Sequence, residues 1–403
     1  MRTIPELLCP AGDREKFFTA LTYGADAVYL GGQDFNLRAR TKGFDLTDLD
    51  FYLNYARQKK KKVYFCLNVF AYEKYLNQVI HYLERLAEIK PDALIVADPG
   101  IIYLAQKYAP HIPLHLSTQA NTSNSFSIKF WHKLGIKRVN LARELNYQQI
   151  RQVMQKVQKL EPEIELEVFV HGALCMAISG RCFLSQYLTQ RSANLGFCSH
   201  PCRFEYVLKE KTRDQDVLEV IEIGNYSKIL ASEDLCLLKY LAWFVKNKLA
   251  SLKIEGRNKT VSYVATVVDV YKTALSHLQQ KKFFYSKYLQ VLKDTFFRPA
   301  GTGFFLGQPK ILYWPKEKRK QTLAWIEKRI SSHRWLVKVK SKWQTSLPVE
   351  LRLPGLRYEL LLPENYTVEK ENGEKVDVAH PGLDYYLCTE CPKLQPYLLI
   401  QNS

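Results

Sequence analysis

Five cysteines lie in a part of the chain that follows no regular helix or strand pattern: Cys175, Cys182, Cys198, Cys202 and Cys236. Two segments that carry them, HGALCMAISGRC and LGFCSHPC, contain glycines that permit turns. Thiols in loops fill no core, and a reducing compartment maintains no disulfide framework. Four thiolates around a soft metal centre would account for them, and that centre is either zinc or an iron–sulfur cluster.

The spacing of these cysteines favours the cluster. Zinc sites prefer two short Cys-x(2–4)-Cys pairs. Cys198 and Cys202 form one such pair, but Cys175 and Cys182 are too far apart to form the other. Ligands spread over several loops suit a cubane cluster better, and surrounding positive charge stabilises thiolates.

The remaining cysteines carry weaker signals. Cys66 lies within the strand-like run VYFCLNV, where a small buried hydrophobe is expected. Cys9 lies at the end of a predicted strand, and its position is compatible both with packing in the core and with a role in a site at the rim. Cys388 and Cys391 have CxxC spacing without a second pair nearby, so two unconnected thiols are favoured over a zinc site.

Short apolar runs alternate with segments of helical periodicity through the first two thirds of the chain. The runs are 6–11, 27–32, 62–70, 93–98, 114–119, 138–145, 165–172 and 251–257. Eight βα units predict a TIM-like (β/α)8 barrel over residues 1–312, with a cysteine-bearing insertion at about 173–250. A doubly wound sheet is the alternative, but AVYLGGQDF lacks the Gly-x-Gly-x-x-Gly turn of dinucleotide sites.

The carboxyl ends of barrel strands meet at one rim, where active sites form. Polar side chains follow several of the predicted strands, including Arg38, Asn68, Gln119, Arg143, Glu144, His171, Glu255 and Arg257. The pattern therefore predicts a site at this rim, next to the insertion.

The pattern changes after a lysine-rich linker at residues 313–321. Residues 322–403 alternate apolar and polar side chains with a period of two, which predicts a small C-terminal antiparallel β-barrel domain. Within it, Asn372-Gly373 predicts a type I′ hairpin turn.

The composition indicates a polyanionic partner. The chain of 403 residues has 58 Lys plus Arg and 40 Asp plus Glu, a formal net charge of +18, together with 25 Tyr. Basic and aromatic residues together suit phosphate neutralisation and base stacking. The basic runs at 59–62 and 316–320 are candidate phosphate contacts. Because no signal peptide or membrane span is evident, we expect a cytoplasmic protein.

The segment EVFVHGALCMAISGRCFLSQ resembles the signature of the collagenase-like peptidase family, a peptidase U family. Other similar blocks are PELLCPAGDREKFFTALTYGADAVYLGG, FNLRARTKGF, LHLSTQANTSN, SEDLCLL, LKIEGRNKTVSYVATVVDVYK and GTGFFLG. The resemblance covers the predicted barrel and is greatest to a branch of prephenate-dependent tRNA uridine hydroxylases.

This resemblance implies hydroxylation of the tRNA wobble uridine to 5-hydroxyuridine, with prephenate as co-substrate and a [4Fe-4S] cluster. By position, the metal ligands implied are Cys175, Cys182, Cys198 and Cys236. Cys202 ranks fifth and competes with Cys198.

Roles for the rim residues follow from the implied substrate. Prephenate has two carboxylates, which guanidinium groups recognise well, so the substrate-binding candidates are Arg38, Arg143 and Arg257. The catalytic candidates are His171, as a proton shuttle or a carbonyl partner, and Glu144 and Glu255, as bases or partners of the arginines. Each arginine could instead belong to a structural ion pair.

Two rival interpretations remain open. The family's name suggests a peptidase, although the sequence has no His-Glu-x-x-His or Gly-x-Ser-x-Gly motif, so a pair such as Cys175 with His171 or His200 would be needed. The other rival is an RNA-binding scaffold with structural zinc. The oxygen donor, the tRNA species and any oligomer or partner subunit stay undetermined.

Overall fold

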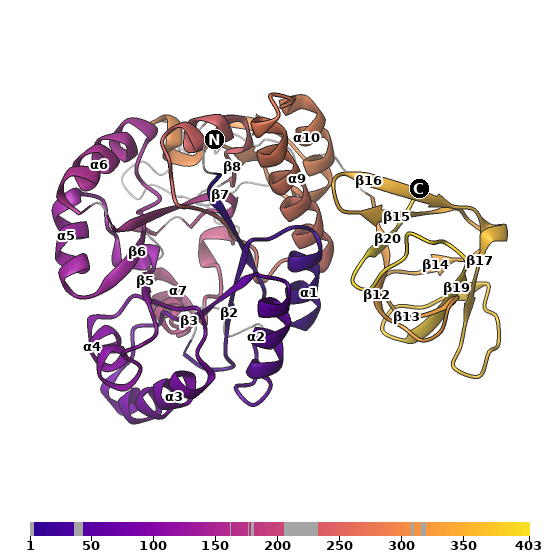
Figure 1. Cartoon of the computed structure of the whole chain (residues 1–403), viewed down its shortest axis with the longest axis horizontal. Helices are drawn as coiled ribbons and strands as arrows, with labels where there is room; N and C mark the ends of the chain where they lie inside the picture. The colour runs from indigo at the N-terminus through magenta and orange to yellow at the C-terminus, as the bar shows by residue number, and fades with distance from the viewer. Residues whose placement is uncertain are drawn as a thin grey trace, which may run out of the picture.

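The computed structural model contains a closed parallel barrel (Figure 1). It describes residues 4–35, 43–161, 163–175, 177–178, 181–204, 233–307, 310–315 and 320–403. The barrel strands, in pairing order, are β1 (Glu6–Pro10), β2 (Ala27–Gly31), β3 (Lys62–Leu67), β4 (Ala93–Val96), β5 (Leu114–Leu116), β6 (Ile136–Asn140), β7 (Glu165–Ala173) and β9 (Ser251–Ile254). Because β9 pairs with both β7 and β1, the sheet closes. The predicted (β/α)8 barrel is confirmed, and each of the eight predicted runs overlaps one of its strands.

Helices surround the barrel. They are α1 (Arg14–Thr22), α2 (Leu49–Gln58), α3 (Leu76–Ile89), α4 (Pro99–Tyr108), α5 (Ser125–Lys133), α6 (Tyr147–Leu160), α8 (Leu241–Lys246), α9 (Val261–Gln279) and α10 (Tyr285–Leu292). Several begin where an Asp or Asn side chain accepts a backbone N–H, as Asp98 does from Ile101 and Asn146 from Gln149. None of the described helices is both long and apolar enough to cross a membrane.

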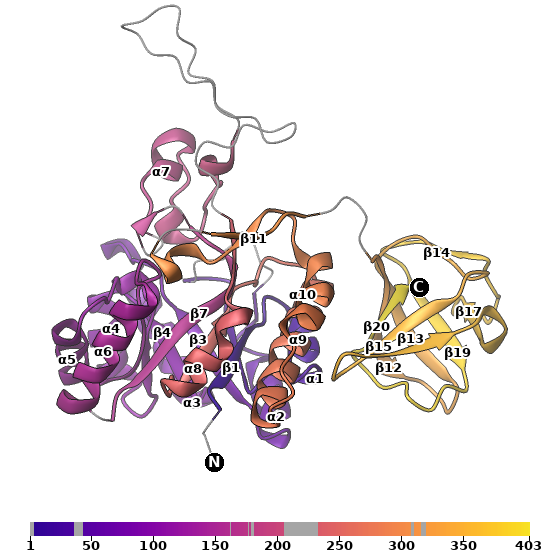
Figure 2. The same cartoon turned by 90° about the horizontal axis from the view of Figure 1, so that it is seen from above.

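The cysteine-bearing insertion follows β7. Its described parts include α7 (Leu184–Thr189) and β8 (Asp234–Cys236), which runs antiparallel to β7. Beyond β8 the sheet is extended by β10 (Ala300–Gly301) and β11 (Ile311–Tyr313). Figure 2 shows α7 standing beyond the barrel on the side opposite the N-terminus, where the parallel strands end.

The two faces of the barrel wall carry different side chains. The outward face packs against the helices in a large hydrophobic cluster, whereas a small inner cluster includes Leu8, Tyr29, Tyr64, Cys66 and Ile95. The interior of such barrels is usually filled with branched apolar side chains. Here it also holds buried ionisable groups, namely His115, Arg138, Glu167 and Lys253.

The C-terminal part is an antiparallel sheet, as predicted. Its strands, in spatial order, are β16 (Arg357–Leu361), β15 (Val349–Leu353), β20 (Leu399–Asn402), β12 (Thr322–Arg329), β13 (Arg334–Val339), β19 (Asp384–Thr389) and β17 (Tyr366–Glu369), with β14 (Trp343–Gln344) paired to β18 (Val378–Ala379).

The type I′ prediction for the turn at Asn372-Gly373 is wrong. Type I′ needs a positive φ at both central residues. Only Gly373 has one, at 85°, and the Gly373 N–H donates to the Lys370 carbonyl. The chain does reverse there, because Lys370 N–H also donates to the Glu374 carbonyl.

The C-terminal sheet is packed against α1 and α9. The ring of Tyr397 stacks on Phe18 with centroids 4.3 Å apart, and the buried Trp325 donates its indole N–H to Thr19 Oγ1 at 3.0 Å. Buried residues of both parts belong to one continuous hydrophobic cluster. The sheet is therefore attached to the barrel by a packed interface as well as by the linker.

A buried carboxylate completes this interface. Asp269 on α9 accepts the backbone N–H of Gly355 at 2.6 Å and lies 3.4 Å from the Arg352 guanidinium. Both side chains of the ion pair are almost fully buried, at 1% and 3% exposure.

Asp269→Ala should therefore lower the free energy of unfolding by about 3–5 kcal/mol, because it leaves the Arg352 charge buried and unpaired. The matched control is Glu15→Ala, which removes the partly exposed Lys340–Glu15 pair across the same interface and should cost at most about 1 kcal/mol. Urea denaturation measures both variants. Equal losses would mean that the Asp269 contact does not anchor the sheet.

Candidate active site at the barrel rim

Three cations share two aromatic rings where the strands end. The Arg143 guanidinium lies 4.0 Å from the centre of the Phe169 ring. Lys253 Nζ lies 4.6 Å from the Tyr29 ring centre and 5.5 Å from that of Phe169, and Arg257 lies 5.6 Å from Tyr29. We call these five residues the cationic rim. Cation–π contacts of this kind hold positive charge in place without neutralising it.

A carboxylate lies directly against this rim. Glu255 is buried and accepts the Tyr29 hydroxyl at 3.0 Å. Its backbone is fixed by Gly172, which has a φ of +113°; a Cβ there would lie 2.4 Å from the Glu255 carbonyl oxygen. Only glycine fits this close approach.

Beneath the cationic rim lies a buried ionic network. Glu167 Oε1 is 3.1 Å from Lys253 Nζ and accepts Asn140 Nδ2 at 2.9 Å, while Ser251 donates to its other oxygen at 2.9 Å. Burial acts to raise the pKa of Glu167, but Lys253 and Arg138 outweigh it and the net pKa is lowered. Glu167 thus stays ionised and holds the Lys253 ammonium within hydrogen-bond distance.

The structure brings together half of the residues predicted to bind or transform substrate. Arg143, Arg257 and Glu255 meet at the cationic rim or against it. Glu144 follows Arg143 and is half-buried. Arg38 lies outside the described residues.

His171 does not face this site. Along β7 the pairing with β9 shifts register between Phe169 and His171, so Phe169 pairs with Lys253 but His171 pairs with Ile254 on the outward face. The imidazole is consequently buried beside α9, with Nδ1 3.2 Å from the Tyr271 hydroxyl. Burial lowers the pKa of His171 to about 3, so the ring is neutral at physiological pH and its surroundings do not favour proton shuttling.

Cys236 also faces away from the rim. It pairs directly with His171 across β7 and β8 and is buried. Burial raises the pKa of its thiol to about 11, with smaller influences from Leu238, Tyr271 and Asp234. The structure thus places this predicted ligand in the layer between the sheet and α9.

The other four cysteines of the insertion lie close enough for their thiols to interact electrostatically. Burial raises the pKa of Cys202, Arg203 lowers it, and the thiols of Cys175, Cys198 and Cys182 each raise it further. In addition, Cys198 Sγ lies 3.7 Å from His200 Nδ1. The structure therefore groups Cys202, which ranked fifth in the sequence, with three of the predicted ligands.

Hydrogen bonds fix this cysteine group to the barrel rim. The Cys182 N–H donates to Asn194 Oδ1 at 3.2 Å, and the Asn194 carbonyl accepts the Phe70 N–H after β3. Arg181 donates from Nε to the Gln119 carbonyl at 2.8 Å and lies 5.0 Å from the Phe70 ring centre. The thiols are thereby held over the ends of β3 and β5.

The thiols do not form a ready-made site for a single metal ion. Within the part of the chain that the structure describes, no three His, Cys, Asp or Glu side chains are close enough to hold one ion. A four-iron cluster separates its thiolates more widely than one ion does, and it takes Cys ligands alone. Four grouped thiols, of which Cys175 is exposed and the other three are partly exposed, fit such a cluster better than a preformed zinc site.

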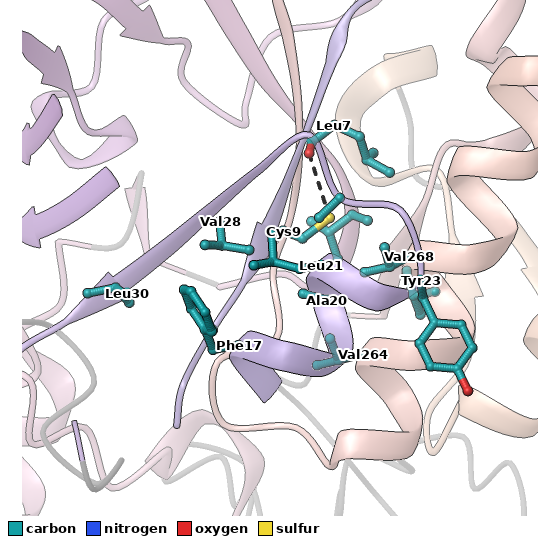
Figure 3. Packing of buried hydrophobic residues seen from close by; sticks show 14 of the residues in the cluster. Leu7, Cys9, Phe17, Ala20, Leu21, Tyr23, Val28, Leu30, Val264 and Val268 are labelled. Atoms are coloured by element: carbon teal, nitrogen blue, oxygen red, sulfur yellow. Dashed lines mark hydrogen bonds between the residues drawn. The ribbon is translucent and has the colours of Figure 1, made fainter. Parts of the chain in front are cut away.

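The remaining candidates lie elsewhere. Cys9 is buried between β1 and the surrounding helices (Figure 3), and burial raises its pKa well above the usual value. The lysines of 59–62 are at the start of β3, opposite the rim, where Lys61 and Lys62 pair with Asp26 and Glu6. Of the run 316–320, residues 316–319 lie outside the described residues.

Lys253 was missed by the sequence reasoning. A signal existed, because Lys253, Glu255 and Arg257 alternate along one strand and so share a face. No comparable pattern in the sequence indicated that Cys202 belongs to the thiol group, because the conformation of the loops decides which thiols lie close together.

Thiol reactivity should separate the grouped cysteines from the buried ones. In metal-free folded protein, N-ethylmaleimide should modify exposed Cys175 fastest and leave Cys236 unmodified. At pH 8 a thiol of pKa about 11 is ionised to only about one part in a thousand, and it is also inaccessible. Peptide mass spectrometry reads each site, with guanidinium-unfolded protein as the control. Equal rates at both residues in folded protein would contradict this placement.

Comparison with known proteins identifies the family to which the barrel belongs. The family model for peptidase family U32 matches residues 12–314. The tRNA hydroxylation protein P of Helicobacter pylori strain J99 is 40% identical over 311 residues, covering 75% of this chain and 72% of that protein. The protein of the same name from Escherichia coli K12 is 32% identical over 446 residues, covering 99% and 97%. A collagenase of Porphyromonas gingivalis is 31% identical over 314 residues, covering 75% and 74%. The chain belongs to peptidase family U32.

Proposed function

We propose that this protein is a tRNA uridine 5-hydroxylase that converts the wobble uridine to 5-hydroxyuridine, with prephenate as co-substrate and a [4Fe-4S] cluster. The observation that carries the proposal is the pairing of a cationic rim with a group of four thiols at one end of the barrel. Similarity to the tRNA hydroxylation proteins of two bacteria, one along nearly the whole chain, supports the reaction class.

The cationic rim suits a small dicarboxylate. Arg143 and Arg257 are held on the rings of Phe169 and Tyr29, and Lys253 lies between those rings. Guanidinium groups bind carboxylates through paired N–H donors, so two such groups match the two carboxylates of prephenate. Glu255, held by Tyr29, is the nearest candidate base.

The cluster would be held by Cys175, Cys182, Cys198 and Cys202. Cys202 replaces Cys236 in this proposal because its thiol interacts with the other three, whereas Cys236 is buried beside α9. When bound, an iron–sulfur cluster supplies one-electron redox chemistry. The protein's own part is to orient the thiols over the rim through Asn194 and Arg181.

The net charge of +18 supports an RNA substrate, because lysine and arginine neutralise phosphates and raise the rate of encounter. A tRNA substrate in turn places the protein in the cytoplasm.

The peptidase alternative has one supporting contact, Cys198 beside His200. Activation of a thiol nucleophile requires its pKa to be lowered or a base to be oriented. The Cys198–His200 pair lies within the thiol group, where a nucleophile would compete with three other cysteines. The hydroxylase therefore explains more of the site than a peptidase or a zinc-bearing scaffold does.

Nucleoside analysis tests the function directly. Mass spectrometry of tRNA from cells lacking this protein should show loss of 5-hydroxyuridine, and the wild-type gene should restore it. A gene with Arg143→Lys should restore less, since an ammonium cannot form the paired N–H contacts of a guanidinium. Unchanged 5-hydroxyuridine in a strain without a second pathway would refute the proposal.

Iron content tests the ligand set. Cys202→Ala should lose most of the iron bound by anaerobically purified protein, together with its visible absorbance, whereas Cys236→Ala should retain both. Both variants replace one cysteine with alanine, so Cys236→Ala is the matched control for Cys202→Ala. The reverse result would restore Cys236 as the fourth ligand.

A further inference from the structure

The insertion exposes two aromatic rings beside the thiol group. Phe183 and Tyr187 lie at the start of and within α7, and each is 74% exposed. Their ring centroids are 6.2 Å apart and their planes are inclined by 32°. Apolar side chains nearby, including Leu188 and Phe197, are also about half exposed. Large aromatic rings clustered in water indicate a binding surface more often than chance exposure.

The chain segment that carries these rings has acidic side chains only at its two ends. Between Glu167 and Glu205 the sequence contains no Asp or Glu, whereas it contains Arg181, Arg191 and Arg203. Arg191 is exposed two residues beyond the end of α7. A segment that combines exposed aromatic rings with an exposed arginine complements a ligand with both phosphates and flat bases. It is a poor match for a basic peptide or for a duplex whose bases are stacked inside.

We infer that Phe183 and Tyr187 form a stacking platform for single-stranded RNA, which holds unpaired bases of the anticodon loop next to the cationic rim. This inference rests on the proposed function and adds the surface that binds its substrate. Figure 2 shows α7 projecting at the end of the barrel where the rim lies, so a loop stacked there has its neighbouring nucleotide near the strand ends. Sequence-specific RNA recognition commonly uses splayed loop bases on aromatic side chains.

The test uses full-length, anaerobically purified protein and a fluorescein-labelled anticodon stem-loop with a wobble uridine. Phe183→Ala and Tyr187→Ala should each raise the Kd about ten-fold in anisotropy titrations, because a stacked base contributes about 1–3 kcal/mol. Phe284→Ala is the matched control: Phe284 is 67% exposed between α9 and α10, at the end of α9 that lies opposite the rim, and the Kd of this variant should stay unchanged. Tyr187→Phe should bind like wild type, because the ring and not the hydroxyl stacks.

Two further readouts separate stacking from other roles. Arg191→Ala should lower the slope of log Kd against log salt concentration by about one, as loss of one phosphate contact does. The ring variants should keep their iron and visible absorbance, which excludes damage to the thiol group.

The inference and the proposed function can fail separately. Ring variants that bind the stem-loop with wild-type Kd would overturn the platform, even if cells lacking the protein lose 5-hydroxyuridine. Weakened binding by these variants with 5-hydroxyuridine intact in such cells would uphold the platform and refute the hydroxylase. Wild-type protein that binds duplex RNA as tightly as the stem-loop would also overturn the platform.

Discussion

Successive residues of each β-strand face opposite sides of the barrel wall, and this alternation decides which side chains can meet inside the closed barrel. Lys253 shares the inner face of β9 with Glu167 and Phe169 of β7, and Glu255 follows directly after β9. The bulge after Phe169 then reverses the alternation on β7 alone. As a result, one strand contributes its aromatic ring to the cationic rim and its histidine to the packing beside α9. A one-residue shift would exchange these two environments.

Burying charged side chains inside the barrel costs free energy, and this cost limits which charges can lie below the site. Burying Arg138, Lys253 and Glu167 is unfavourable unless each charge is paired and hydrogen-bonded. The network satisfies this condition below the rim, with Arg138 bonded to Glu6 at 2.6 Å and Glu167 shared by two cations. Glu167, which balances the charge of Lys253, lies one layer below the rim, whereas Glu255 lies against the rim itself. An anionic ligand at the rim would meet cations directly.

The insertion is held in place by different contacts from those of the barrel. Its four grouped thiols are not packed in a core, so their grouping depends on a few anchors to the rim, such as Asn194 to Phe70 and Arg181 to Gln119. Few buried apolar contacts allow such loops to adjust when they bind a group. The C-terminal sheet, in contrast, is fixed to α1 and α9 through Trp325, Tyr397 and Asp269.

The sequence by itself determined the barrel, the antiparallel C-terminal sheet and the family, because hydrophobic periodicity and cysteine motifs are local properties of the chain. It also placed Arg143, Glu255 and Arg257 at strand ends that share one rim. Only the tertiary structure decided that Cys202 joins the thiol group while Cys236 and His171 are buried elsewhere. The physical reason is that loop paths and a single bulge are set by contacts between segments distant in sequence, and local patterns do not encode them.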